Sequence, residues 1–352
     1  MKNAVLRKAL TMVVLCGILS SSVNMNAIAE SYSSPKQYVV ISKSDGNYSV
    51  NTYSMTPYEA SKMKQLNDDI LVVEEDGYVK GSQIQDKESW KEIKTQKNKH
   101  DKKVIKKSSK DSKTEWNLQA VKASEVQTQS GQKVKVAIID SGIDFTTDID
   151  VYLRKNFIPG EDEIPVIYED ITGHGTSVAG IIAAKDNDDG ITGINPNVEL
   201  YSARVLDKNL SAPISRVVEA IYWAIDNKVN IINMSFGTTT DSEALRQAIK
   251  DAYNAGILIV AAAGNNGVIE YPAAYDEVIA VGSVDCNGDR CDSSATGEDL
   301  ELMAPGEQIL STGGFGGVAV TSGTSMASPH VAAIASVLWQ KDLNCSSIIS
   351  FK

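Results

Sequence analysis

A short apolar run that ends at a carboxylate is found in this chain of 352 residues in Val134-Lys135-Val136-Ala137-Ile138-Ile139-Asp140-Ser141-Gly142. Such a run predicts a buried strand, because it is too short for a typical helix. Similar runs follow at 199–205, 230–234, 257–262 and 277–281, and segments with helical spacing, such as 214–227 and 241–255, separate them. Strands that alternate with helices form a parallel sheet with helices on both faces. We therefore predict an α/β fold of this kind.

Unusual polar motifs follow the predicted strands, at the sheet edge where chemistry gathers in α/β folds. Asp140 ends the first strand, where a carboxylate can be aimed at a second group, although Asp at a strand end is also a common helix cap. His174 lies in Gly173-His174-Gly175-Thr176-Ser177-Val178-Ala179-Gly180. The flanking glycines allow close backbone approach, and the small residues suit a helix packed tightly on the sheet. A histidine in this setting is not typical of a core.

Two further motifs lie later in the chain. Ser325 is found in Ser322-Gly323-Thr324-Ser325-Met326-Ala327-Ser328-Pro329-His330, ahead of an apolar run. At the N-terminus of a buried helix, backbone N–H groups can hold a developing oxyanion. Asn265, in Ala261-Ala262-Ala263-Gly264-Asn265-Asn266-Gly267, could donate a second hydrogen bond to it. Ser325 alone would suit an N-cap and Asn265 alone a turn, so the combination with Asp140 and His174 carries the prediction.

These four motifs resemble those of the subtilisin family of serine proteases, and the resemblance covers about residues 116–340. It implies a catalytic triad in which Asp140 orients the imidazole, His174 acts as general base and then acid, and Ser325 is the nucleophile. Asn265 and the backbone N–H of Ser325 would bind the oxyanion. The expected activity is that of a serine endopeptidase, and its chemistry requires no cofactor.

The resemblance also implies how an extended peptide substrate docks. Family members hold it between two strand edges, which correspond here to Leu210-Ser211-Ala212 and Ser235-Phe236-Gly237. In the same alignment Glu270 falls near the floor of the pocket for the residue that precedes the scissile bond. A carboxylate there would favour Arg or Lys, whereas a Glu270 that points to solvent would give no such preference.

The N-terminus has the pattern of an export signal over residues 1–29, with basic residues, an apolar run and an Ala27-Ile28-Ala29 cleavage site. The apolar run is shorter than the roughly 20 residues that a membrane anchor needs. We therefore expect a secreted, extracellular protein without a membrane anchor after signal removal.

Three segments follow the signal. Residues 30–90 contain predicted strands at 37–42 and 69–73 with a helix at 56–66 between them, and the region resembles the family's inhibitory propeptide. Residues 91–115 form a Lys-rich linker that would contain or border the maturation site, as a solvated and protease-accessible segment would. The catalytic domain is predicted over 116–352. The expected product is a zymogen that is inhibited by its own propeptide and removes it by autocatalytic cleavage.

Charge is distributed unevenly along the chain. Up to Lys113 there are 19 Lys and Arg against 13 Asp and Glu, and from Thr114 onward 15 against 32. The acidic catalytic region lacks the clustered cations that bind a phosphate backbone, and the Lys-rich linker lacks aromatic residues that would stack on bases. Nucleic acid is therefore excluded as an expected partner. The acidic surface suits cationic peptides, or serves solubility alone.

Calcium and a disulfide are the structural additions that the sequence allows. The family often binds calcium in an oxygen-rich loop, which here would hold the ion near Asp186, Asn187 and Asp188, although the segment also fits an ordinary acidic turn. Cys286 and Cys291 flank a turn and could pair in a small local disulfide, which would leave Cys345 without a mate. Three histidines are too few to suggest a zinc site.

The sequence leaves the physiological role open. Family members usually continue with further helices beyond the serine helix, so the end at Lys352 suggests a truncated C-terminus, and a catalytically defective peptide-binding protein is one alternative. Among active proteases, a broad degradative enzyme competes with one that matures a secreted peptide. The Lys-rich linker, Glu270 and the Trp116-Asn117-Leu118-Gln119-Ala120 segment resemble the lantibiotic leader peptidase and toxin-activator branch, which favours processing.

Overall fold

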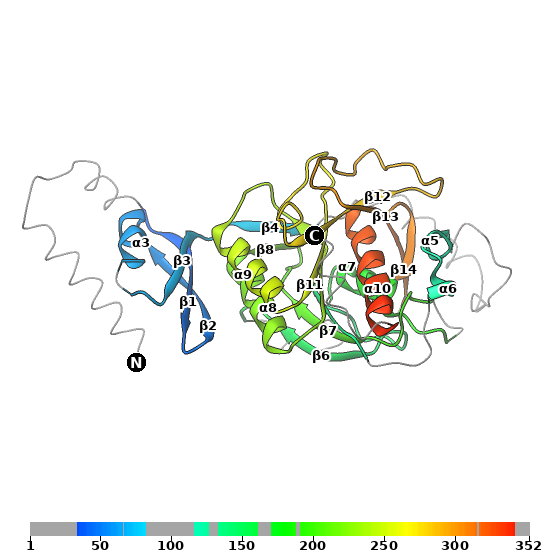
Figure 1. Ribbon diagram of the computed structural model, residues 1–352, viewed down its shortest axis with the longest axis horizontal. Coiled ribbons are helices and arrows are strands. Elements are labelled where there is room, and N and C mark those ends of the chain that lie inside the picture. The colour runs from blue at the N-terminus through cyan, green and yellow to red at the C-terminus, as the bar shows by residue number, and fades with distance from the viewer. Residues whose placement is uncertain are drawn as a thin grey trace, which may run out of the picture.

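The structure is a computed structural model that describes residues 34–65, 67–81, 116–126, 133–160, 170–187, 191–314 and 317–341. The predicted export signal, the Lys-rich linker and Cys345 lie outside the described residues. Within those ranges, no helix combines the length and apolar character needed to cross a bilayer. Figure 1 shows a small N-terminal α+β unit beside a larger α/β unit.

The N-terminal unit is a three-stranded antiparallel sheet with one helix. β1 (Lys36–Ser44) lies between β2 (Asn47–Met55) and β3 (Ile70–Glu75), and α3 (Pro57–Met63) connects β2 to β3. A capping box starts α3, because Thr56 and Glu59 each bond the other's backbone N–H. The two predicted strands and the helix are confirmed, but the sequence does not predict β2, which is polar and whose residues are nearly all exposed or half-exposed.

The larger unit is built on a seven-stranded sheet in the order β13-β12-β11-β9-β5-β7-β6, in which each strand pair is parallel. In chain order, the strands are β5 (Lys135–Asp140), β6 (Val151–Asn156), β7 (Glu199–Arg204), β9 (Ile231–Met234), β11 (Leu258–Ala262), β12 (Val278–Val284) and β13 (Leu302–Pro305). β6 and β7 lie on one side of β5, and the later strands β9, β11, β12 and β13 lie on the other, so the direction in which strands are added reverses at β5. In open parallel sheets, ligands bind at the carboxyl ends of the strands near such a point.

Helices cover both faces of this sheet (Figure 1). α8 (Ile214–Asp226) and α9 (Glu243–Asn254) pack on one face, and α7 (His174–Ala183) and α10 (Thr324–Lys341) pack on the other. Alternate residues of β5 join the two cores, with Ala137 and Ile139 under α8 and α9 and Val136 and Ile138 under α7 and α10. The predicted α/β fold is therefore confirmed.

Shorter elements complete the larger unit. α5 (Trp116–Ala120) and α6 (Ala123–Val126) precede the sheet, and β14 (Ile309–Thr312) pairs with β15 (Val318–Thr321) in an antiparallel hairpin just before α10.

A third small sheet joins the two units. β4 (Tyr78–Gly81), which follows the N-terminal unit in sequence, lies between β8 (Ser211–Pro213) and β10 (Phe236–Gly237) and runs antiparallel to both. Figure 1 shows β4 beside β8 within the larger unit. Its two neighbours lie in the segments that were expected to hold an extended peptide.

Carboxylates of the N-terminal unit also bond the start of two helices in the larger unit. Glu74 accepts hydrogen bonds from the Ser242 hydroxyl (2.7 Å) and the Ala244 N–H (2.9 Å) at α9. Asp76 accepts from the N–H (2.9 Å) and hydroxyl (2.7 Å) of Ser215 at α8. Negative charge is favourable at a helix N-terminus, so these contacts orient the N-terminal unit on the larger one.

The local disulfide does not form, since Cys286 and Cys291 are both free. The reason is the register of the turn that they flank. The N–H of Cys291 donates to the carbonyl of Ser283 (2.9 Å), and Arg290 bridges to Val284. Cys291 therefore lies opposite Ser283, whereas Cys286 lies in the turn beyond the end of β12, so the two cysteines are not opposite each other.

Candidate active site

The predicted Asp140–His174 pair is formed. Asp140 is the last residue of β5 and His174 the first of α7, and His174 Nδ1 lies 2.6 Å from Asp140 Oδ1. Both side chains are fully buried. Gly175 has to be a glycine, since a Cβ there would lie 2.1 Å from the carbonyl oxygen of Gly142. The Gly-His-Gly motif thus lets α7 start against the end of β5, which brings the imidazole to the carboxylate.

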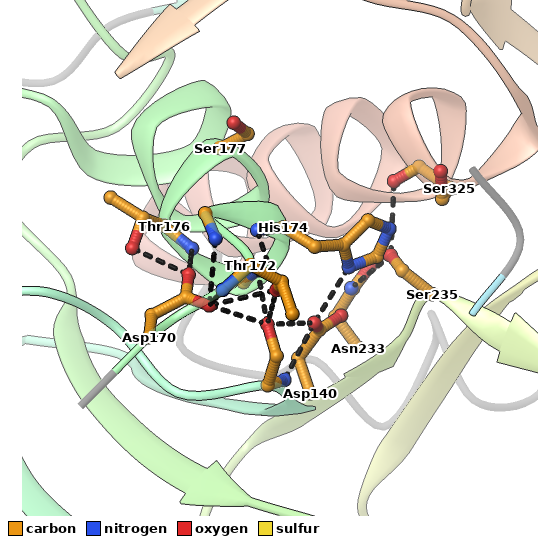
Figure 2. A network of polar contacts seen from close by, with 12 residues as sticks. Asp140, Asp170, Thr172, His174, Thr176, Ser177, Asn233, Ser235 and Ser325 are labelled. Atoms are coloured by element: carbon orange, nitrogen blue, oxygen red, sulfur yellow. Dashed lines mark hydrogen bonds and ion pairs between the residues drawn. The ribbon is translucent and has the colours of Figure 1, made fainter. Parts of the chain in front are cut away.

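A buried carboxylate that the sequence analysis did not single out holds this arrangement (Figure 2). Asp170 is fully buried, and its Oδ1 accepts hydrogen bonds from the Ser141 hydroxyl, the Thr172 hydroxyl and the N–H groups of Thr172 and Gly173. Its Oδ2 accepts from the N–H (2.8 Å) and hydroxyl (2.7 Å) of Thr176. Asp170 therefore ties the end of β5 to the first turn of α7, on both sides of His174.

Ser325 is the second residue of α10, as predicted, and is fully buried. Pro329 lies one turn later and has no N–H, so it cannot bond the Ser325 carbonyl in the usual helical way. That carbonyl accepts instead from the hydroxyl of Ser235 (3.0 Å), which also accepts from the Asn233 amide (3.1 Å). Asn233 of β9 and Ser235, just beyond its end, thus fix the start of α10, as Figure 2 shows.

The reactive atoms of the expected base and nucleophile are His174 Nε2 and Ser325 Oγ. Among the described residues, neither His174 Nε2 nor Ser325 Oγ has a hydrogen-bond partner, although both atoms are buried. In enzymes without substrate, catalytic hydrogen bonds are often long and tighten only when substrate binds. The arrangement provides a histidine that Asp140 orients and a serine hydroxyl that no hydrogen bond of the described residues engages.

The pKa of His174 agrees with a base whose protonated form is stabilised by the Asp140 carboxylate. Burial by itself lowers the pKa of His174, but the charge and hydrogen bond of Asp140 outweigh this effect and raise the pKa above its ordinary value. Burial raises the pKa of Asp170, because Asp170 is charged when deprotonated, and hydrogen bonds from Thr176 oppose that rise. Because each hydrogen bond described above is donated to Asp170, the arrangement suits its ionised form.

Asn265 is held beside Ser325. Its Oδ1 accepts hydrogen bonds from the N–H (3.0 Å) and the hydroxyl (3.2 Å) of Thr324, the residue before the serine. These contacts fix which end of the amide is oxygen, so the nitrogen end is directed away from Thr324. This orientation is compatible with the predicted role of Asn265 as an oxyanion donor.

His330, in the same helix, has a structural role. Its Nδ1 donates to the Met326 carbonyl (2.7 Å), and its Nε2 lies 3.0 Å from the Asn117 amide, so the imidazole links α5 to α10. Burial lowers the pKa of His330 to about 4, although the Met326 hydrogen bond opposes this. The imidazole is therefore neutral at physiological pH.

The predicted substrate edges form a groove that β4 occupies. Val79 pairs with Ala212 and Lys80 with Ser211 on one side, and Lys80 pairs with Gly237 and Gly81 with Phe236 on the other. The Gly81 N–H donates to the Leu210 carbonyl (2.8 Å). Peptides that add a strand to an existing edge bind through such backbone bonds.

Glu270 points into the protein and not to solvent. It is 7% exposed and accepts a hydrogen bond from the Asn266 amide (2.7 Å). A Cβ on Gly237 would lie 2.3 Å from Glu270 Oε2, and one on Gly264 would lie 3.0 Å from its Cγ. The carboxylate thus lies between two glycines, beside the strand that pairs with β4. Burial raises the pKa of Glu270, and the Asn266 hydrogen bond opposes the rise.

The described part of the proposed calcium loop does not gather ligands. Asp186 lies 3.4 Å from the Thr192 hydroxyl, and the Asn187 amide donates to Asp148 (2.9 Å). Asp188 lies outside the described residues. Calcium takes six to eight oxygens, and no group of three or more acidic, His or Cys residues suited to a metal occurs in the ranges that the structure covers. Calcium therefore stays a prediction.

Comparison with known proteins agrees with this geometry. The sequence model of the subtilase family matches residues 131–347. Subtilisin DY of Bacillus licheniformis is 45% identical over 235 residues, which cover 64% of this chain and 84% of that protein. Alkaline elastase YaB of Bacillus sp. (strain YaB) is 39% identical over 66% of this chain and 62% of its own length. Subtilisin E of Bacillus subtilis (strain 168) is 41% identical over 64% and 61%, respectively. The chain belongs to the subtilase family of serine endopeptidases.

Proposed function

We propose that this chain is the precursor of a secreted serine endopeptidase that is inhibited by its N-terminal unit, with β4, the strand that follows this unit, occupying the active site. The observation that carries the proposal is the position of β4, which lies as a third strand between the edges that lead to Ser325. An endopeptidase needs an extended peptide in such a groove, and an inhibitor needs to fill the same place.

The residues of the site support an acyl-enzyme mechanism. His174 Nε2 takes the proton of Ser325 Oγ as this oxygen attacks the peptide carbonyl, and Asp140 stabilises the imidazolium that forms. The Asn265 amide and the Ser325 N–H hold the oxyanion. His174 then protonates the leaving amine, and water hydrolyses the acyl-enzyme by the reverse sequence of proton transfers.

Contacts outside the groove should strengthen inhibition by the N-terminal unit. Replacing Glu74 and Asp76 by Ala removes the carboxylates that bond the start of α9 and α8, while Ser325 and the groove stay unchanged. A separately produced N-terminal unit with both substitutions should inhibit the mature enzyme at least tenfold more weakly than the wild-type unit. Lys36→Ala, which removes an exposed pair with Glu75 within the unit itself, is the matched control.

A basic preference at the residue before the scissile bond is supported by Glu270. Its buried carboxylate lies against Gly237 and has Asn266 as its hydrogen-bonded partner, so a cationic side chain would find an opposite charge there. Fluorogenic peptides that end in Arg or Lys should be cut about tenfold faster than those that end in Leu. Glu270→Gln keeps the shape and removes the charge, so it should abolish this difference; an unchanged preference would place its cause elsewhere.

Within the family, we favour maturation of a secreted peptide, such as a lantibiotic leader or toxin precursor, over broad degradation. The Lys-rich linker and the Glu270 carboxylate support a selective enzyme. Digestion of denatured casein separates the two roles, because a processing enzyme should release few fragments and a degradative enzyme many. Secretion is tested by the N-terminus of the extracellular precursor, expected at Glu30.

The test of the whole proposal is a time course of residues 30–352 as wild type and as Ser325→Ala. The wild type should lose its N-terminal unit and gain activity, and Ser325→Ala should stay intact. A folded wild type that neither cuts itself nor cleaves added peptides would favour the peptide-binding alternative.

A further inference from the structure

Ser235 lies at the carboxyl edge of the main sheet, one strand away from Asp140. In the parallel register of β5 and β9, Ile139 pairs with Met234. The residues that follow them, Asp140 and Ser235, therefore lie at the same level of adjacent strands. From this level Asp140 bonds the imidazole of the expected base, and the Ser235 hydroxyl bonds the carbonyl of Ser325 at 3.0 Å (Figure 2). One row of the sheet thus contacts both reacting residues.

The hydrogen bond from Ser235 replaces one that helix α10 lacks. In an α-helix, the carbonyl of each residue accepts from the N–H four residues later. For Ser325 that residue is Pro329, which has no N–H. The donor comes instead from the sheet, through the Ser235 hydroxyl. The carbonyl carbon of Ser325 is bonded to the same Cα that carries the reactive side chain, so a contact that fixes this carbonyl also fixes the origin of that side chain.

The direction of this hydrogen bond follows from its neighbours. Ser235 Oγ lies 3.1 Å from the Asn233 amide nitrogen, which can only donate, and 3.0 Å from the Ser325 carbonyl, which can only accept. The Ser328 hydroxyl, at 3.0 Å, can take either role. A hydroxyl has one proton and two acceptor sites, so this set is satisfied when Asn233 and Ser328 donate to Ser235. The single proton of Ser235 is then directed to the carbonyl.

The start of α10 is held at two points on either side of the nucleophile's Cα. The N–H of Thr324 donates to Asn265 at 3.0 Å, and the carbonyl of Ser325 accepts from Ser235 at the same distance. Ser235 directly follows β9, which pairs with β5 on one side and β11 on the other. Its side chain is fully buried and its hydroxyl is fully engaged within the protein. The contact is therefore anchored in the centre of the sheet.

We propose that Ser235 is a positioning residue that holds the Ser325 hydroxyl where it can attack the substrate carbonyl, as Asp140 holds the imidazole. This inference rests on the proposed protease function and goes beyond the docking of peptides, because it assigns the Ser235 side chain to the rate and not to the choice of peptide. Misplacement of a catalytic group by about 1 Å costs on the order of 100-fold in rate. The contact should therefore affect kcat far more than KM.

The first test removes the hydroxyl. Ser235→Ala should lower kcat at least tenfold and change KM less than threefold, with an unchanged midpoint in the pH profile because His174 keeps its carboxylate. Ser235→Cys keeps the size of the side chain but offers only a weak donor, so kcat should fall at least threefold. Ser336→Ala is the matched control. Ser336 is also fully buried and bonds a carbonyl of α10, that of Ala333 at 2.6 Å, about three turns after the nucleophile. Its kcat should stay within threefold of the wild type.

The second test is a double-mutant cycle. Pro329→Ala gives position 329 an N–H that can bond the Ser325 carbonyl within the helix. Ser235→Ala should then lower kcat less than threefold in the Pro329→Ala chain, against at least tenfold in the chain with Pro329. A packing or folding defect of Ser235→Ala would lower kcat by the same factor in both chains. The comparison holds whatever Pro329→Ala does alone, because that variant is its own baseline.

Each variant is produced as residues 30–352. A trace of wild-type enzyme, far below the level that would mask a tenfold loss, removes the N-terminal unit where a variant is too slow to do so. Urea unfolding in the Ser325→Ala background measures the stability of Ser235→Ala and Ser336→Ala. The rate of fluorophosphonate labelling of Ser325 is a second readout without a peptide in the groove, and in Ser235→Ala it should fall at least tenfold, as kcat does.

Two results would overturn this inference while leaving the protease function intact. One is a kcat of Ser235→Ala within threefold of the wild type. The other is an equal loss from Ser235→Ala in the Pro329 and Pro329→Ala chains. A folded wild type that neither cleaves peptides nor reacts with the fluorophosphonate would instead contradict the proposed function.

Discussion

Replacing Asp170 by Ala should damage both stability and catalysis, although Asp170 touches no reacting atom. Its two oxygens accept from the N–H groups of Thr172, Gly173 and Thr176 and from three hydroxyls, and it is fully buried. Leaving a buried donor unsatisfied costs about 1–3 kcal/mol, and hydroxyls can turn to other acceptors whereas N–H groups cannot. Three N–H groups at the lower end of that range give a loss of about 3–5 kcal/mol.

The catalytic loss follows from the position of these donors. They belong to the segment that carries His174, and misplacement of a catalytic group by about 1 Å costs on the order of 100-fold in rate. We expect kcat of Asp170→Ala to fall at least 100-fold with KM little changed, because the groove residues are untouched. Asp170→Asn keeps the shape and part of the hydrogen bonding, and should lie between Asp170→Ala and the wild type.

Stability is measured by urea unfolding in the Ser325→Ala background, which prevents self-digestion, and kcat is measured with a fluorogenic peptide in the active background. Glu298→Ala, which removes an exposed carboxylate outside α7 and the segment before it, is the control. If Asp170→Ala changed unfolding by less than about 0.5 kcal/mol and kcat by less than twofold, the reasoning would be refuted, since satisfied buried donors are its whole basis.

Three other predictions concern protonation and metal binding. Because His174 acts as a base only when neutral and its pKa is raised, kcat/KM should rise with pH through a midpoint above 6.5, and Asp140→Asn should move any residual activity to a lower midpoint. His330 has a pKa of about 4 in the folded state, below its ordinary value, so the unfolded state takes up a proton at a higher pH than the folded state does. About 3 kcal/mol of the stability present above pH 6.5 should therefore be lost as the pH falls towards 4. Urea unfolding of Ser325→Ala with and without His330→Gln should show the difference. Calcium near Asp186 and Asn187 should raise the Tm of Ser325→Ala relative to EDTA, and an equal Tm in both buffers would remove the calcium proposal.

Much of the fold follows from short-range patterns in the sequence. β5 and β11 are predictable because each is a continuous apolar run, and strands buried on both faces require such runs. The Asp140–His174 pair is predictable because both residues stand at ends of such elements, where a polar residue next to apolar ones is conspicuous. The resemblance to a family adds the groove edges, which are only three and two residues long in β8 and β10.

Long-range pairing sets what the sequence does not predict. β4 has four residues without a repeating pattern, and its partners lie more than 100 residues later in the chain, so no local signal identifies it as a strand. Asp170 precedes α7 at a position that no motif quoted from the sequence includes, and its importance comes from six donors that converge only in the folded state. A search for a buried Asp a few residues before a Gly-His-Gly motif could have found it. For Cys286 and Cys291, closeness in sequence suggested a disulfide that does not form, because closeness in sequence does not give the register that a disulfide requires.

The central claim is that Ser325 is a nucleophile activated by His174 and Asp140. We would treat the enzyme, freed of its N-terminal unit, with a fluorophosphonate that forms a stable bond to activated serines, and locate the added mass by peptide mapping. The account predicts one adduct, on Ser325, with complete loss of activity, and no adduct in His174→Ala. A folded wild-type domain that acquires no adduct on Ser325, or one that remains active after full labelling there, would contradict it.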